Sequence, residues 1–381
     1  MKKTLINIRY FLAPLLIIVT MLGVLMGDIF VWTGVVLFGV GIIFDTLSMS
    51  YHPKGAGVDE DGNTYGIPGL QNLVMYLMLP VFVLLQLVMA WRVYGYVSAT
   101  PSETILLFNF LPIQMGISGI ELTGATISTG IFAGIGIIYG HELSHTKGYS
   151  FVISRFMMAL SGSAHFSYAH VYNHHLELAS EDDPATAPRG RDIYTHLWLS
   201  HMGQSNFLYA MEKQRLKRIN KPFFSVCNRW IRGYLMSLPT IFLFFYVGGV
   251  IGIACLFLIW VISNFELEAL NYMEHYGLIR VKGQPIDYRH SWDNDSMFTS
   301  WFFIEIGRQA DHHDRGETHF WELDDVGAPN PGYGYFTEFV IALIPPLWHS
   351  VYKKKLAQWD KQFASEEELE IAKRINQQAG Y

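Results

Sequence analysis

Six apolar runs dominate this sequence and restrict what the chain can fold into. Each run is long enough to cross the roughly 30 Å hydrocarbon core of a bilayer as a helix. Of the 381 residues, 51% are hydrophobic and only 16% are charged. We therefore expect an all-α integral membrane protein with six transmembrane helices, whose main solvent is lipid. The expected spans are 10–27, 29–46, 71–91, 107–140, 230–248 and 249–266.

Basic residues outside the apolar runs predict the orientation of the chain. Two lysines and Arg9 precede the first span, and a basic run from Lys213 to Lys221 separates the fourth span from the fifth. By the positive-inside rule both regions are cytoplasmic. Six crossings return the C-terminus, with Lys353, to the same side. We expect a multi-pass protein of a bacterial-type inner (plasma) membrane, with both termini in the cytoplasm.

The spans and the segments between them are expected to form one unit. No internal repeat or low-complexity linker divides residues 1–381, so we expect a single domain. On this topology the segments 141–229 and 267–335 face the cytoplasm. The shorter apolar stretch 336–352 contains two adjacent prolines and is expected to be an interfacial or partly buried helix.

The histidines are concentrated in the two cytoplasmic segments. His141 and His145 end the fourth span in HELSH, where i, i+4 spacing places both imidazoles on one helical face, as two ligands of one metal require. In AHVYNHH, His170 and His174 share a face in the same way, and His175 could reach a second metal. Eight clustered imidazoles exceed what one ion takes, so the sequence predicts two metals, although imidazole suits iron, zinc, copper and nickel alike. The predicted ligands are His141, His145, His170, His174, His175, His275, His312 and His313.

Acidic residues are interleaved with these histidines. A metal-bound imidazole usually donates its second ring proton to a carboxylate or a carbonyl. Glu142, Glu274 and Asp311 are therefore candidates for supporting the ligand rings, whereas Glu177 and Glu181 are expected to be solvated charges.

The isolated histidines and both cysteines are expected to be structural. His290 is left open, as a structural residue or a ligand, because it lies between two ligand segments. The residues expected to be structural are His52, His165, His196, His201, His319, His349, Cys227 and Cys255.

The motifs HELSH, HVYNHH and DHH, together with NYMEHYGL, resemble the membrane-bound alkane and xylene monooxygenases, which are related more distantly to membrane fatty-acid desaturases. The segments DDPATAPRGRDIY, HYGLIR and ALIPPLW and the charged C-terminal tail look most like the hydroxylase component of xylene or cymene methyl-monooxygenases. The resemblance implies a non-haem di-iron centre held by histidines, O2 as co-substrate, and a rubredoxin or ferredoxin-type reductase as electron donor. The implied reaction is hydroxylation of a hydrophobic hydrocarbon at an aryl-methyl group or at the terminal methyl group of an alkane.

One position departs from the family pattern. The family has a further histidine three residues before the final histidine pair, and here that position is Gln309. The glutamine amide oxygen, His290 or a water could fill the ligand position.

Other functions share parts of the pattern. The same di-iron chemistry would serve a fatty-chain desaturase or decarboxylase. HELSH also matches the H-E-x-x-H signature of zinc metalloproteases, but a protease leaves the remaining clustered histidines without a role. A metal transporter would hold its ligands near the bilayer midplane, whereas these lie at the ends of spans and between them. The net charge of −6 and the lack of a long basic tract give no sign of a nucleic-acid partner.

Overall fold

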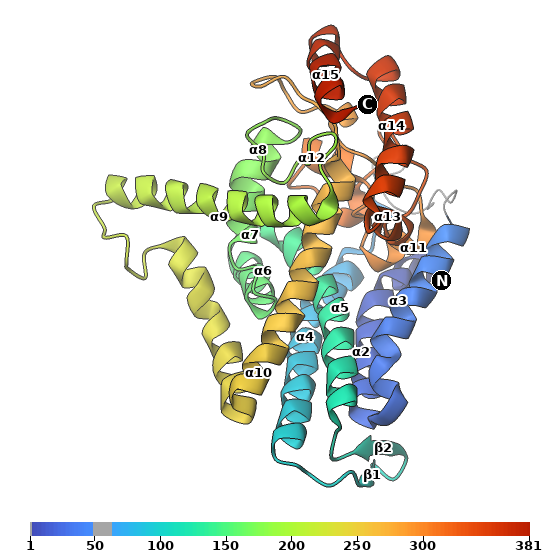
Figure 1. Cartoon of the computed structure of the whole chain (residues 1–381), viewed down its shortest axis with the longest axis vertical. Coiled ribbons are helices and arrows are strands. Elements are labelled where there is room, and N and C mark those ends of the chain that lie inside the picture. The colour runs from blue at the N-terminus through green and yellow to red at the C-terminus, as the bar shows by residue number, and fades with distance from the viewer. Residues whose placement is uncertain (1, 49–62) are drawn as a thin grey trace.

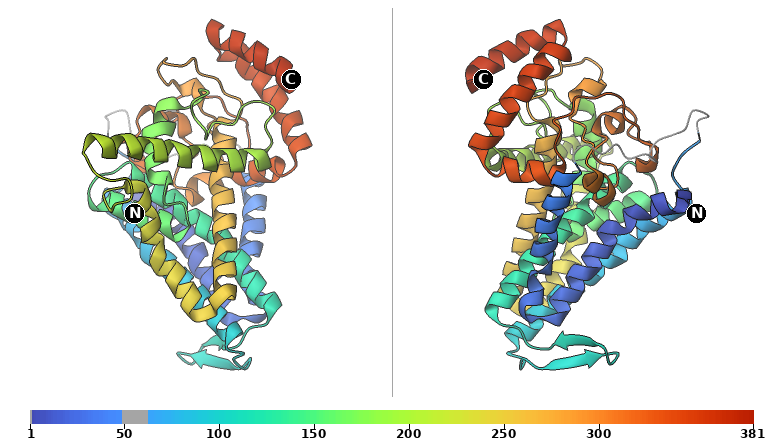
Figure 2. Two further views of the ribbon diagram at one scale, coloured as in Figure 1. Left: turned by 60° about the vertical axis from the view of Figure 1, so that its left-hand side comes forward. Right: turned by 90° about the vertical axis from the view of Figure 1, so that its right-hand side faces the viewer.

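The computed structural model describes residues 2–48 and 63–381 and shows a bundle of long helices capped at one end by shorter ones (Figures 1 and 2). Both termini lie toward the cap (Figure 1). Five helical stretches within the described residues are long and apolar enough to cross a membrane: Ile8–Met26, Asp28–Leu47, Pro68–Val97, Gly119–Ser144 and Arg229–His275.

The first two stretches each begin with a 3-10 turn and continue as an α-helix. After α1 (Lys2–Asn7), the turn η1 (Ile8–Phe11) leads into α2 (Leu12–Met26). The turn η2 (Asp28–Trp32) leads into α3 (Thr33–Leu47). These bounds lie within two residues of the first two predicted spans.

The third stretch is the single helix α4 (Pro68–Val97), which has proline in its first turn, where the missing N–H is not needed by the helix. A small antiparallel hairpin follows, made of β1 (Thr104–Leu107) and β2 (Leu111–Gln114). The fold is therefore mostly helical rather than all-α.

The fourth stretch, α5 (Gly119–Ser144), starts later than the sequence predicted. The expected span began at residue 107, but residues 104–114 form the hairpin. The helix begins after Ser118 because this residue and Glu121 form a capping box that satisfies the first free N–H groups.

Helix α10 (Arg229–His275) is bent back on itself. Gly249 interrupts it with φ 54° and ψ −131°, a conformation that glycine adopts far more readily than other residues. Figure 1 shows the two arms as a hairpin. The bend lies at the predicted boundary between the last two spans. The second arm continues beyond the predicted end at residue 266, so His275 is the last helical residue rather than a residue outside the helix.

Helix α5 is the central helix of the bundle. In its most apolar window 83% of the residues are buried inside the protein, against 22% in the windows of Asp28–Leu47 and of α10. The C-terminal end of α5, with His141 and His145, is therefore enclosed by the other helices and by the cap.

The cap is formed by short helices and by the longer α9, which lies across the end of the bundle (Figure 1). Residues 336–352, predicted as one helix, are divided between two, because Pro345 begins a new helix after a break at Leu343 and Ile344. The cap elements are α6 (Tyr149–Leu160), α7 (Phe166–Ala169), the π-helical turn η3 (His170–His174), α8 (His175–Glu177), α9 (Ile193–Arg218), η4 (Tyr288–His290), α11 (Met297–Phe302), α12 (Gln309–Asp314), η5 (Phe320–Glu322), α13 (Tyr335–Ala342), α14 (Pro345–Gln362) and α15 (Glu366–Ala379).

A buried ion pair joins the start of the first membrane stretch to the cap. The Arg9 Nη2 atom lies 2.9 Å from Glu305 Oε1, and both side chains are at most 4% exposed. The Tyr10 hydroxyl donates to the same oxygen at 2.7 Å. The pair therefore fixes the N-terminal segment against the residues that precede α12.

We predict that Glu305→Gln destabilises the protein by about 3–5 kcal/mol, because it removes one charge of a buried, hydrogen-bonded ion pair. Thermal unfolding in detergent would measure this loss. The matched control is Glu317→Gln, which removes an exposed pair with Lys147 and should cost about 1 kcal/mol or less. Equal midpoints for the two variants would contradict the prediction.

Candidate metal centre

The structure brings all eight predicted ligand histidines together beneath the cap. Within each of two groups, the candidate ligand nitrogens lie within 4.8 Å of one another. The group of five consists of His141, His145, His170, His175 and His312, and the group of three consists of His174, His275 and His313.

Four chain segments supply these side chains. The end of α5 contributes His141 and His145, and the end of α10 contributes His275. The turn η3 contributes His170 and His174, and the start of α8 contributes His175. Helix α12 contributes His312 and His313. Each of these segments is a helix end or a single helical turn, and the histidine side chains of all four segments meet beneath the cap.

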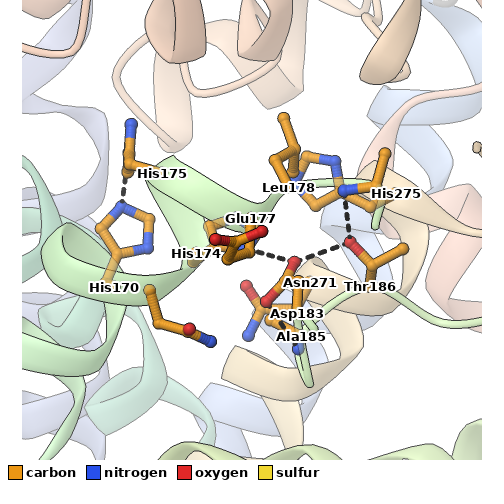
Figure 3. Close-up of polar contacts among 12 residues, drawn as sticks. His170, His174, His175, Glu177, Leu178, Asp183, Ala185, Thr186, Asn271 and His275 are labelled. Atoms are coloured by element: carbon orange, nitrogen blue, oxygen red, sulfur yellow. Dashed lines mark hydrogen bonds and ion pairs between the residues drawn. The ribbon is translucent and has the colours of Figure 1, made fainter. Parts of the chain in front are cut away.

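The π-helical turn η3 changes the predicted pairing of the second motif. The i, i+4 spacing predicted that His170 and His174 share a face, with His175 directed elsewhere. Instead the Nε2 atoms of His170 and His175 lie 3.0 Å apart, and His174 belongs to the other group (Figure 3). A π-helical turn is closed by i→i+5 hydrogen bonds and holds more residues per turn than an α-helix, which brings His175 round to His170, and such turns are frequent at functional sites.

The geometry of the group of five fits a cation. The His170 Nε2 atom lies 2.7 Å from His141 Nε2, 3.1 Å from His145 Nε2 and 3.0 Å from His175 Nε2. One ring nitrogen carries either a single proton or a single lone pair, so it cannot form three hydrogen bonds of this kind at once. Ring nitrogens that approach one another to about 3 Å are instead what a metal with bonds of roughly 2 Å brings together.

The group of three is equally compact. The ring centroids of His174, His275 and His313 lie 4.9 to 5.0 Å apart. Both ring nitrogens of His275 and both of His313 are buried without a hydrogen-bond partner. Buried polar atoms normally have partners, so these nitrogens are available as ligands.

Most of the imidazoles outside the membrane helices are held neutral. Burial, together with the neighbouring imidazoles, lowers the pKa values of His145, His170 and His175 well below the ordinary range. The same causes lower the pKa of His313, and burial lowers that of His312 to about 4. A neutral imidazole offers a lone pair, which is the form that binds metals.

His174 differs because a carboxylate supports it. Asp183 Oδ2 lies 2.8 Å from His174 Nδ1, and Asp183 also accepts a hydrogen bond from Thr186 (Figure 3). Burial acts to lower the pKa of His174, but Asp183 raises it above its usual value. Burial acts to raise the pKa of Asp183, but His174 and Thr186 hold it below its usual range. The carboxylate therefore orients the ring, with Nε2 directed away from it.

Asp183 was not among the predicted supporting residues. The sequence signal that could have found it is its position nine residues after His174, in a short acidic segment that follows the histidine motif. Only the folded loop distinguishes it from Asp182, whose side chain is 43% exposed and pairs with Lys282.

The predicted supporting carboxylates have other partners. Glu142 accepts a hydrogen bond from the Phe320 backbone N–H, and Asp311 is held by Arg315 and the Asp324 backbone N–H. Among the described residues neither carboxylate hydrogen-bonds to one of the predicted ligand rings, and their supporting role stays a prediction.

The third predicted carboxylate lies nearer to the rings. A Glu274 oxygen is 4.0 Å from His275 Nε2, beyond hydrogen-bonding distance. The side chains of Tyr335 and Gln309 lie near the Glu274 carboxyl, whose Oε1 atom is buried with no hydrogen-bond partner among the described residues.

His290 and Gln309, the two side chains that could take the place of the missing family histidine, have different surroundings. Both ring nitrogens of His290 are engaged, since Nδ1 accepts from the Asp287 backbone N–H and Nε2 contacts Glu368 at 2.8 Å. His290 is therefore structural. The Gln309 side chain is buried and lies near the Glu274 carboxyl.

The isolated histidines lie outside both groups within the described part of the chain. His165 packs against His201, His319 stacks on Trp321, and the His349 ring contacts two tyrosine hydroxyls. His196 is buried beside Tyr272. Cys227 and Cys255 are both free thiols. His52 lies outside the described residues.

Comparison with known proteins places this arrangement in a family. The family model described as fatty acid desaturase matches residues 120–337, more than half of the chain. A xylene/toluene monooxygenase hydroxylase component from Pseudomonas putida is 26% identical over 98% of this chain and 96% of its own length. An alkane 1-monooxygenase from Acinetobacter baylyi is 31% identical over 62% of this chain and 60% of its own length, and one from Alcanivorax borkumensis is 25% identical over 86% and 79%.

The apolar helices and the two histidine groups define a membrane protein of the fatty acid desaturase family, and the chain belongs to that family. Within it, the chain belongs with the membrane-bound alkane and xylene monooxygenases. The expectation from the histidine motifs is confirmed.

We predict that Asp183→Asn weakens metal retention by about 10–100-fold, because it removes the carboxylate that orients His174. Metal content after titration with a chelator would measure the change. Asp182→Asn is the matched control, since its exposed side chain lies outside the site, and its metal retention should equal that of the wild type. If both variants retain metal equally well, the role assigned to Asp183 is wrong.

Proposed function

We propose that this protein is the hydroxylase component of an O2-dependent monooxygenase, which hydroxylates a methyl group of a hydrophobic hydrocarbon at a histidine-ligated di-iron centre. The observation that carries the proposal is the division of eight histidines, six of them buried and two half-buried, into groups of five and three beneath the cap. One ion has no use for eight imidazoles, whereas two ions would use all of them. The methyl group belongs to an arene of the xylene type or to the end of an alkane.

The proposed topology has six crossings. It counts the two arms of α10 separately, which the bend at Gly249 supports. The basic residues in the last turn of α9, among them Arg215 and Lys217, support a cytoplasmic cap. The protein would then lie in the inner membrane with both termini in the cytoplasm, where a rubredoxin or ferredoxin-type reductase donates electrons.

The residues of this chain would hold, orient and shield the reacting centre. The group of five and the group of three would each hold one iron, and Asp183 would fix the orientation of His174. When bound, the two irons would supply the oxidising power, drawn from O2 and two electrons, that breaking an unactivated C–H bond requires. The histidines are mostly buried beneath the cap, which limits contact of the centre with bulk water.

An apolar pocket beside the histidines supports a hydrocarbon substrate. Ile138 of α5 lines a small cavity together with His141 and His312, and it also lines an apolar pocket deeper in the bundle. A hydrocarbon dissolved in the bilayer would approach along this side of α5 and would need no aqueous path.

The rival functions fit the structure less well. In the metalloprotease signature Glu142 would be the general base, but this carboxyl accepts a hydrogen bond from the Phe320 backbone. The histidines gather at one end of the bundle, which does not suit a transporter. A desaturase or decarboxylase would use the same metal ligands, so only the product distinguishes it from a hydroxylase.

We predict about two irons per chain in protein purified from iron-supplemented cells. His313→Ala should lose at least one iron, because the group of three retains only two ligands. His201→Ala, a half-buried histidine outside both groups, should retain both irons. Elemental analysis with Mössbauer spectroscopy would measure this, and one zinc without iron in the wild type would overturn the proposal.

The reaction itself is tested by product analysis with isotopically labelled O2, a suitable electron donor, and xylene or an alkane as substrate. We expect an alcohol that carries the label. An alkene product would instead identify a desaturase.

A further inference from the structure

One carboxyl group inside the membrane bundle has no role in the fold that the structure shows. Glu266 lies on the second arm of α10 and lines the apolar pocket described above. Its Oε2 atom is buried and has no hydrogen-bond partner among residues 2–48 and 63–381. A buried polar atom without a partner costs free energy, so a residue of this kind points to a ligand.

The surroundings of Glu266 are almost entirely apolar. The residues lining the pocket, all of them within the described chain, include no lysine, arginine or histidine, and apart from Glu266 the single polar side chain is that of Tyr335. Aromatic rings of α3 and α13, such as Phe38 and Phe336, form much of the opposite wall. No cation is therefore present in the pocket to pair with the carboxyl group.

Space for the carboxyl group is provided by a glycine on the neighbouring helix. A Cβ atom placed on Gly134 of α5 would lie 1.8 Å from Glu266 Oε2. Any side chain at Gly134 would thus displace the carboxyl group. The pair Gly134 and Glu266 forms one end of the pocket.

The pocket points toward the histidine groups along both helices. On α5, Gly134, Ile138, His141 and His145 follow one another at spacings of four, three and four residues, so they share one helical face. At the helical rise, Gly134 lies about 10 Å from His141 along α5, and Glu266 lies about 14 Å from His275 along α10. Ile138 lines both this pocket and the cavity at His141 and His312.

We propose that Glu266 binds an oxygen substituent of the substrate, so that the preferred substrate is a hydrocarbon with a hydroxyl or carbonyl group at the end remote from the methyl group that reacts. This inference rests on the proposed hydroxylase function and names its substrate class. The oxygen atom hydrogen-bonds to the Glu266 carboxyl, and the apolar chain extends past Ile138 to the histidines. The pocket is narrow, with a free volume of about 30 Å³, so flexible side chains such as Met273 move aside when the substrate enters.

The turnover test compares n-octanol with n-nonane, which have the same number of heavy atoms. With the wild-type enzyme kcat/KM should be about tenfold higher for n-octanol, as one net hydrogen bond provides, and a series of alcohols should show a sharp optimum of chain length. In Glu266→Leu the ratio of kcat/KM for n-octanol to kcat/KM for n-nonane should fall to about one or below, while n-nonane is still hydroxylated. An unchanged ratio in Glu266→Leu, or a wild-type ratio of one, would overturn the proposal.

Three further variants test whether the effect of Glu266→Leu is only a general loss of folding. Gly134→Ala pushes the Glu266 carboxyl group aside and should lower the preference for n-octanol. Gly130→Ala crowds Ile262 instead and should leave the preference for n-octanol unchanged. Glu266→Gln can still donate and accept hydrogen bonds and should retain part of the preference. Equal effects of the two glycine variants would contradict the role of the carboxyl group.

A binding measurement separates this inference from the proposed function. Addition of n-octanol to the purified holoenzyme should shift an infrared band of a carboxyl group, and the shift should be absent in Glu266→Gln and on addition of n-nonane. If neither compound is hydroxylated but the band shifts, the substrate site stands and the assigned reaction fails. If no band shifts, the substrate site fails whatever the turnover.

Discussion

The convergence of eight imidazole rings is the constraint on which the rest of the structure depends. Three ring nitrogens surround His170 Nε2 at about 3 Å, and several others are buried without partners. Rings that cannot satisfy one another by hydrogen bonds need a cation, so this arrangement links the stability of the site to metal binding. The helix ends that carry the rings must therefore be fixed by the central position of α5 and by the cap packed over them.

Two local features determine how the rings are shared between the groups. The π-helical turn η3 directs His170 and His175 to the same group and leaves His174 for the other. Asp183 then orients His174 through Nδ1. The π-helical turn departs from regular α-helical geometry, and turns of this kind recur at functional sites. A regular helix through this motif would have placed His170 beside His174 and altered both groups.

The membrane bundle contributes more than a hydrophobic support. The face of α5 that ends in His141 and His145 begins at Gly134, opposite Glu266. By our proposal the same helix therefore carries metal ligands at its C-terminal end and, seven residues before His141, a glycine that makes room for a substrate-binding carboxyl group. This gives the substrate a defined length and orientation, which a purely apolar channel would not provide.

The sequence by itself determined the apolar stretches, the bend at Gly249 and the identity of all eight histidines that the structure groups, because hydropathy, glycine and histidine spacing are local signals. It did not determine the start of α5, where apolar residues before Ser118 form a hairpin and only the capping box fixes the helix. It also did not single out Asp183 as the partner of His174, since Asp183 and Asp182 are adjacent in sequence and differ only in which one the fold turns toward His174. The grouping of the rings and the isolation of Glu266 depend on distances between segments far apart in the chain, and such distances exist only after the helices have packed.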